Sequence, residues 1–137
     1  MRRPLAVATA LIVMLTAPGL AAVPSFDITR FYTEAEFAAA IRPYTEAIAR
    51  NANDAEAHYW LGVAYLHGAR LHRLGLAPYA TGFAAKAVES LERATKLRAD
   101  VRALVALMEA YAVINDQAKS ADVVARLVRI GEIPLKK

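Results

Sequence analysis

The sequence predicts an all-α protein of about five helices that pack as antiparallel hairpins. Apolar residues of the region 34–131 recur at steps of three and four, and no alternation with a period of two is long enough for a strand. Helix-breaking residues divide this region into five pieces. Because the connections between the pieces are short, successive helices are expected to be antiparallel neighbours.

The first 21 residues are predicted to be a signal peptide. Two arginines precede an apolar run over residues 5–15, a Pro-Gly pair follows the run, and Gly19 and Ala21 are small residues at the two positions that a signal peptidase inspects. This order is typical of a Sec leader that is cleaved after Ala21 or Ala22, so we expect a periplasmic or secreted protein. The alternative is an uncleaved anchor, since residues 5–23 approach the roughly 17 to 25 apolar residues of a membrane span. The threonines and the Pro-Gly pair argue against an anchor.

Residues 22–33 form a predicted N-terminal extension that precedes the helical domain. Phe26, Phe31 and Tyr32 give this short segment an aromatic character. We expect these side chains to fold back over the open end of the helical stack, which would otherwise expose apolar surface.

The first helix is predicted over residues 34–50. Thr33 and Glu36 have the spacing of a capping box at its start. Pro43 lies inside the helix, where it removes a backbone hydrogen bond and clashes with the preceding turn. We therefore expect either a kink near residues 39–42 or a division into two short helices.

The second helix is predicted to begin after Asn53, a capping residue supported by Glu56 three positions later. It runs to about Arg73. Gly75 and Pro78 then end it, because neither residue continues a helix easily.

Three further helices complete the predicted domain. The third covers residues 79–97, and the fourth runs from its cap Asp100 to about residue 114. The fifth covers residues 118–130 after an Asn-Asp turn. Gly131 is placed as its C-terminal cap, and a proline three residues later prevents the helix from resuming. The domain therefore covers residues 34–131, and residues 132–137 form a C-terminal tail.

Composition limits the possible functions. The 137 residues suffice for one domain with a core of its own, and the absence of cysteine excludes disulfides, thiolate catalysis and cysteine-based zinc sites. Without residues 1–21 the chain has 15 basic and 13 acidic residues, a net charge of +2. Bulk charge therefore does not indicate nucleic acid as a partner.

The residues that carry chemistry do not form a recognisable active site. His67 and His72 are five positions apart and His58 is nine before His67, whereas metal-binding pairs on a helix prefer three or four. The carboxylates mostly fall on polar helix faces, and the sequence has neither a glycine-rich phosphate loop nor a serine elbow. We expect no catalytic residue, no metal site and no cofactor.

The second predicted helix resembles the first helix of a tetratricopeptide repeat (TPR). Leu61, Gly62 and Tyr65 match the family's pattern, and His58 stands where the family usually has tryptophan. The small glycine lets the partner helix come close. Looser matches extend over roughly residues 34–130, which we interpret as two repeats preceded by half of one.

The resemblance implies a short right-handed solenoid that holds a peptide or helix in a concave groove. Tyr59 and Val63 occupy two positions with which some relatives clamp a terminal carboxylate, so that mode of binding is not expected. The residues implied to face the groove come from the first helices of the two repeats: Glu56, Tyr59, Val63, Leu66, Arg70, Arg102, Val105 and Glu109. The alternative is that these residues pack against another part of the same assembly.

The central hairpin departs from the family. Ala55 and Val101 are 46 residues apart, against a usual repeat of about 34 residues. We expect the excess to lengthen both helices and to form a projecting basic tip with His72, Arg73 and Tyr79. This tip is either solvated or a contact for an acidic partner or phospholipid headgroups.

These observations favour a non-catalytic interaction module or adaptor of the bacterial cell envelope, with an unidentified protein or peptide as partner. The first alternative is a periplasmic carrier or sensor of an apolar small ligand between the long central helices. The second is a membrane-tethered assembly factor, if the leader is kept. Self-association through the helix at 118–130 is a further expectation, because its apolar residues exceed what one neighbour covers: Val123, Val124, Leu127, Val128 and Ile130.

Overall fold

The computed structural model describes residues 22–131, and within that range the protein is all-α. The predicted leader (1–21), the predicted tail (132–137) and Pro134 lie outside the described residues. The described elements are α2 (Glu34–Arg50), α3 (Ala55–Arg73), the 3₁₀ turn η2 (Pro78–Ala80), α4 (Phe83–Leu97), α5 (Val101–Val113) and α6 (Gln117–Ile130).

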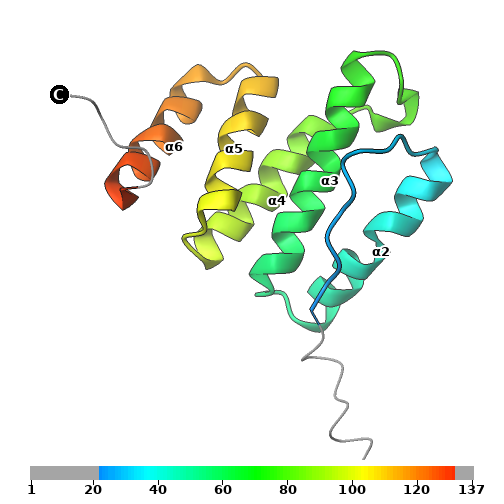
Figure 1. The fold of residues 1–137 in the computed structure, drawn as a ribbon, viewed down its shortest axis with the longest axis horizontal. Coiled ribbons are helices and arrows are strands. Elements are labelled where there is room, and N and C mark those ends of the chain that lie inside the picture. The colour runs from blue at the N-terminus through cyan, green and yellow to red at the C-terminus, as the bar shows by residue number, and fades with distance from the viewer. Residues whose placement is uncertain (1–21, 132–137) are drawn as a thin grey trace, which may run out of the picture.

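Successive helices pack as antiparallel hairpins, as the sequence predicts. α3 packs against α2 and α4, α4 packs against α5, and α5 packs against α6. Figure 1 shows the helices side by side, with α4 behind α3. α3 also touches α5 directly, so these two helices share one face of the stack. No helix within residues 22–131 has both the length and the apolarity needed to cross a membrane.

α2 is one continuous helix through Pro43, so a division into two short helices is wrong. The capping box at its start is confirmed: the Glu36 amide donates to Thr33 Oγ1 at 3.1 Å, and the Thr33 amide donates to Glu36 Oε1 at 2.9 Å. Phe37 and Tyr44 are both buried, and they lie two turns apart on one face. Packing on both sides of the proline thus favours a single helix.

The start of α3 lies one residue beyond the prediction. Asp54, not Asn53, is the N-cap, and its carboxylate accepts a hydrogen bond from the Ala57 amide at 3.0 Å. Asn53 instead accepts one from Arg93 at 3.0 Å, which ties the α2–α3 turn to α4. Both side chains suit a cap, and the chain uses the second because the first is engaged elsewhere.

The third predicted helix begins too early. Residues 78–80 form η2, and Gly82 precedes α4 with a φ of +81°, a left-handed conformation that ends any helix running through it. The excess length of the central hairpin therefore consists of a long α3 and a connecting loop, while α4 is shorter than expected.

The last two helices begin at aspartates and end as the sequence predicts. Asp100 caps α5 by accepting the Arg102 amide at 2.8 Å, and Asp116 caps α6 by accepting the Lys119 amide at 3.1 Å. Gly131 adopts a φ of +88° and its amide donates to the Leu127 and Val128 carbonyls. The predicted C-terminal glycine cap is confirmed.

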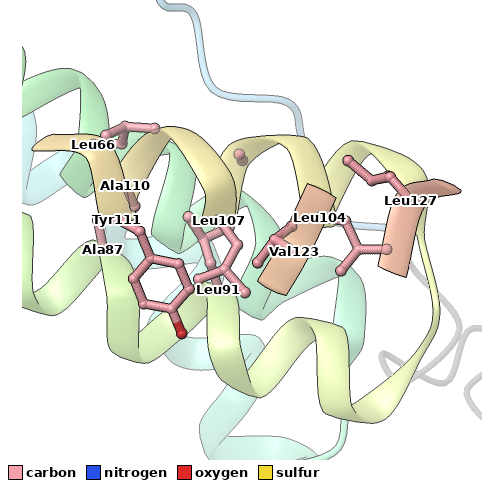
Figure 2. Packing of buried hydrophobic residues seen from close by; sticks show 10 residues of the cluster. Leu66, Ala87, Leu91, Leu104, Leu107, Ala110, Tyr111, Val123 and Leu127 are labelled. Atoms are coloured by element: carbon pink, nitrogen blue, oxygen red, sulfur yellow. The ribbon is translucent and has the colours of Figure 1, made fainter. Parts of the chain in front are cut away.

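Two clusters make up most of the core. An aliphatic cluster joins α3, α4, α5 and α6, and Figure 2 shows its leucines converging between the helices. An aromatic cluster joins α2, α3 and the extension. The close packing of α3 on α4 depends on Gly62, since a Cβ there would lie 2.5 Å from Cγ of the fully buried Leu91.

The extension (residues 22–33) packs against the side of the stack where a preceding helix would otherwise lie. It runs beside α2 and α3 in Figure 1 before turning into α2. Phe26 and Tyr32 are buried and stack with ring centroids 4.9 Å apart. Phe31 is 66% exposed, so the predicted covering role holds for two of the three aromatic residues.

Candidate functional site

A cleft of about 410 Å³ lies between α3 and α5 on their shared face. Seven of the eight groove residues predicted from the sequence line it; Glu56 does not. The lining residues are Ile28, Tyr59, Val63, Leu66, His67, Arg70, Val101, Arg102, Val105, Ala106 and Glu109.

The floor of this groove is aliphatic. Leu66 and Ala106 are buried, and Val63 and Val105 are half-buried beside them. Val63 and Leu66 are three positions apart on α3, and Val105 and Ala106 are consecutive on α5. These aliphatic residues lie between two polar pairs that each join α3 to α5, Tyr59 with Arg102 and Arg70 with Glu109. Apolar patches bordered by polar residues are typical of surfaces that receive apolar side chains.

One end of the groove is held by a network of four charged side chains. Glu56 accepts hydrogen bonds from Arg98 at 2.8 Å and from Arg102 at 2.9 Å. Asp100 accepts from the same two arginines at 3.1 and 2.8 Å. Glu56 therefore positions Arg102 and does not face the groove itself.

The hydrogen bonds of this network lower the pKa of its two carboxylates. Hydrogen bonds from Arg102 lower the pKa of Asp100 to about 2, against the opposing effect of burial. A hydrogen bond from Arg102 likewise lowers the pKa of Glu56. Both carboxylates thus remain ionised at neutral pH, and their charges are matched by the two arginines.

The remaining charges and rings of the groove are also paired. The Arg102 guanidinium lies 4.5 Å from the centroid of the Tyr59 ring, and burial raises the pKa of Tyr59. Arg70 and Glu109 form an ion pair of 3.1 Å across α3 and α5. The groove therefore presents an aliphatic strip bounded by charges that already satisfy one another.

Sequence reasoning missed four lining residues: Ile28, His67, Val101 and Ala106. His67 follows Val63 by four positions and so shares its face, a signal that helical periodicity contains. Ile28 is 55% exposed and belongs to the extension, where no periodicity indicates its neighbours. His67 donates to the Arg30 carbonyl at 2.9 Å and thereby holds the extension at the edge of the groove.

The predicted tip residues do not form one exposed cluster. Arg73 is exposed, together with Leu74. His72 is exposed too, but its Nδ1 lies 2.9 Å from the Ala77 carbonyl and ties down the loop. Tyr79 turns inward: its ring packs on Phe83, and its hydroxyl donates to the Tyr32 carbonyl at 2.7 Å.

A second cleft, of about 580 Å³, lies on the other side of α3. It is lined from α3 by His58, Leu61 and Tyr65, which a turn of 100° per residue places opposite the groove face. Its rim mixes lysines, arginines and glutamates of α4. This cleft is larger than the groove, but its charges are of both signs and it has no continuous aliphatic floor.

The three histidines contact backbone carbonyls of separate segments. His58 lies 2.9 Å from the Ala52 carbonyl, while His67 and His72 make the contacts described above. Among residues 22–131, no three histidine or carboxylate side chains gather as they would around a metal ion.

No protein-family model, curated protein or solved structure matches this chain.

Proposed function

We propose that this protein is a non-catalytic, TPR-like interaction module that holds a short apolar segment of another protein in the groove between α3 and α5. The observation that carries the proposal is that seven of the eight residues implied by the family resemblance line one cleft with an aliphatic floor. Buried aliphatic floors with polar rims are typical of peptide and helix grooves.

The chemistry of the groove indicates the kind of segment it would hold. Arg70 is paired with Glu109, and Arg102 is paired with Glu56 and Asp100. A strongly charged segment would have to break these pairs, whereas aliphatic or aromatic side chains can cover Val63 and Val105 without disturbing them. We therefore propose a segment that presents two or three apolar side chains and little net charge.

The location follows from the predicted leader. A Sec signal over residues 1–21 would place the mature chain in the periplasm or outside the cell, where the partner would be another envelope or secreted protein. The membrane-tethered alternative requires retention of the leader. Sequencing the N-terminus of protein recovered from the native host distinguishes the two.

The carrier alternative has less support. The cleft beside Phe83 measures about 220 Å³, less than the roughly 300 to 1,000 Å³ of most small-molecule pockets. The second cleft, between α3 and α4, has the size of such a pocket at about 580 Å³, but its rim carries charges of both signs, which suit an apolar ligand poorly. Trp60 lines none of the clefts described above, and its indole N–H donates to Glu56 at 2.9 Å.

Photo-crosslinking in the native host tests the groove. A crosslinking residue at Tyr59 is expected to yield one discrete product, with matched positions at His72 on the tip and Arg93 on the rim of the second cleft as controls. Val105→Glu should abolish the Tyr59 product, because it places a charge on the aliphatic strip. A far-ultraviolet circular dichroism spectrum of this variant checks that the fold persists.

The identified partner then allows a direct measurement. Calorimetric titration should show binding weakened at least about tenfold by Val105→Glu, equivalent to about 1.4 kcal/mol, and unchanged by Lys96→Glu on the other side of the stack. A product from His72 or Arg93 alone, or equal binding by both variants, would overturn the groove proposal.

A further inference from the structure

α6 is covered on one side only. Val123 and Leu127 face α5 and are fully buried. On the opposite side, Ala121, Val124 and Ala125 are exposed and Val128 is half-buried. These four residues, here called the outer α6 stripe, follow the i, i+3, i+4, i+7 pattern of a surface that packs against another helix.

The stripe is suited to close contact with a second helix. Two of its residues are alanines, so the backbone of a partner helix can approach to the short end of the usual 8 to 10 Å range of interaxial distances. Valines at the other two positions supply the apolar area. None of the stripe residues lines the groove between α3 and α5.

Two charged residues along one edge of the stripe indicate which protein supplies the second helix. Asp122 and Arg129 are seven positions apart, which places them two turns apart on the same edge. Neither forms an ion pair within residues 22–131. The point midway between Asp122 and Arg129 along α6 lies within about one residue of the midpoint of the stripe.

This arrangement is complementary to itself. A twofold axis through that midpoint pairs two α6 helices in antiparallel orientation and brings Asp122 of each copy opposite Arg129 of the other. The same axis packs Val124 and Ala125 of the two copies against each other. In a parallel pair related by a twofold axis along the helices, the charged edges of the two copies would lie on opposite sides of the contact and these ion pairs could not form.

We propose that a second copy of this chain docks antiparallel along the outer α6 stripe. One helix pair buries less than the roughly 1,200 to 2,000 Å² of a standard interface, so the dimer is weak and depends on concentration. The groove stays open in this dimer, which would present two grooves to partners.

Single cysteines test the orientation, because the natural chain contains none. Ala125→Cys in the leaderless chain (22–137) is expected to form an intermolecular disulfide under mild oxidation, since the twofold axis passes beside this position. Ala118→Cys, seven residues earlier and also exposed, is the matched control and should remain a thiol. Equal crosslinking of both would indicate a parallel pair or random collision and would overturn the proposal.

Sedimentation equilibrium tests the stripe and its charges. The unaltered leaderless chain should show a monomer–dimer equilibrium, and Val124→Glu should raise its dissociation constant at least tenfold. Leu74→Glu, an exposed leucine on the hairpin tip, should leave the constant unchanged.

Charge exchange gives the decisive readout. Asp122→Arg and Arg129→Asp should each weaken the dimer several-fold, while the double variant should restore it to within about threefold, since the reciprocal pairs re-form. A monomer at every concentration, or a double variant no better than the singles, would overturn the proposal. Circular dichroism of each variant checks that α6 remains folded.

Discussion

The two ends of the helical stack are closed in different ways. At the first end, the non-helical extension buries Phe26 and Tyr32 against α2 and α3. At the other end, α6 buries Val123 and Leu127 inward and leaves Val124 37% exposed. A stack of helices therefore does not need another helix at its end, provided that a short segment supplies enough apolar surface.

Aromatic side chains explain how the twelve residues of the extension (22–33) can close the first end of the stack. Each ring buries far more area than an aliphatic side chain, and stacked or edge-on pairs add a favourable contact. Polar anchors also fix the segment: His67 holds the Arg30 carbonyl, and Tyr79 holds the Tyr32 carbonyl. α6 receives no comparable cover within the described residues.

The largest expected effect comes from opening the first end. Phe26→Ala should lower the free energy of unfolding by about 3 kcal/mol, because it removes a buried ring and leaves a cavity beside Tyr32 and Phe37. Phe31→Ala is the matched control in the same segment, and its exposed ring predicts a change below about 0.5 kcal/mol. Urea denaturation of a protein that comprises residues 22–137 measures both.

Similar losses for the two phenylalanines would show that the extension is not packed as described. In that case the first end would not be closed by the aromatic side chains of the extension, and the contrast with α6 would not hold.

The second largest effect on the free energy of unfolding is expected at the close contact between α3 and α4, which lies between the two ends of the stack. Gly62→Ala is expected to cost about 2 kcal/mol, because the added methyl group would overlap Leu91. In a Leu91→Ala background the same change should cost little or nothing, since the overlapping atoms are gone. Thermal unfolding of the four proteins in this cycle measures the coupling, and additive effects would contradict the close α3–α4 contact.

The smallest of the three effects concerns the charged network that joins α3 to α5. Because the folded state lowers the pKa of Asp100 from 3.8 to about 2, its stabilising contribution is complete above the unfolded value and is lost as the pH falls from about 4 to 2. Asp100→Asn, which keeps a capping oxygen, should cost about 1 kcal/mol at pH 7 and flatten this acid dependence.

Denaturant titrations of both proteins at several pH values check the expectation. If the free energy of unfolding of the two proteins changed with pH in the same way, folding would not lower the pKa of Asp100. The first end provides a contrast, because no ion pair of the described residues joins the extension to α3.

Helical periodicity predicted the helices, since it depends on local spacing. The groove residues, among them Val63 and Val105, were predicted from the resemblance of α3 and α5 to the first helices of a tetratricopeptide repeat. The exact starts of α3 and α4 could not be predicted, because Asn53 is engaged by Arg93 and Gly82 adopts a left-handed conformation that depends on the loop.

Contacts between non-helical and helical segments were the least predictable. Ile28 reaches the groove, and Tyr79 turns from the tip toward the extension, through packing between residues far apart in the chain. No local pattern encodes such contacts. The prediction that Tyr79 belongs to an exposed tip was wrong for the same reason.

The anchors of the extension also set an order for folding. His67 contacts a residue 37 positions earlier and Tyr79 one 47 positions earlier, so the first end of the stack consists of contacts with high sequence separation. Phe26 and Tyr32 are synthesised well before His67 and Tyr79, so the contacts of the extension with these two residues can form only after much more of the chain has been made. The part of the domain that is made first is therefore the part that is completed late.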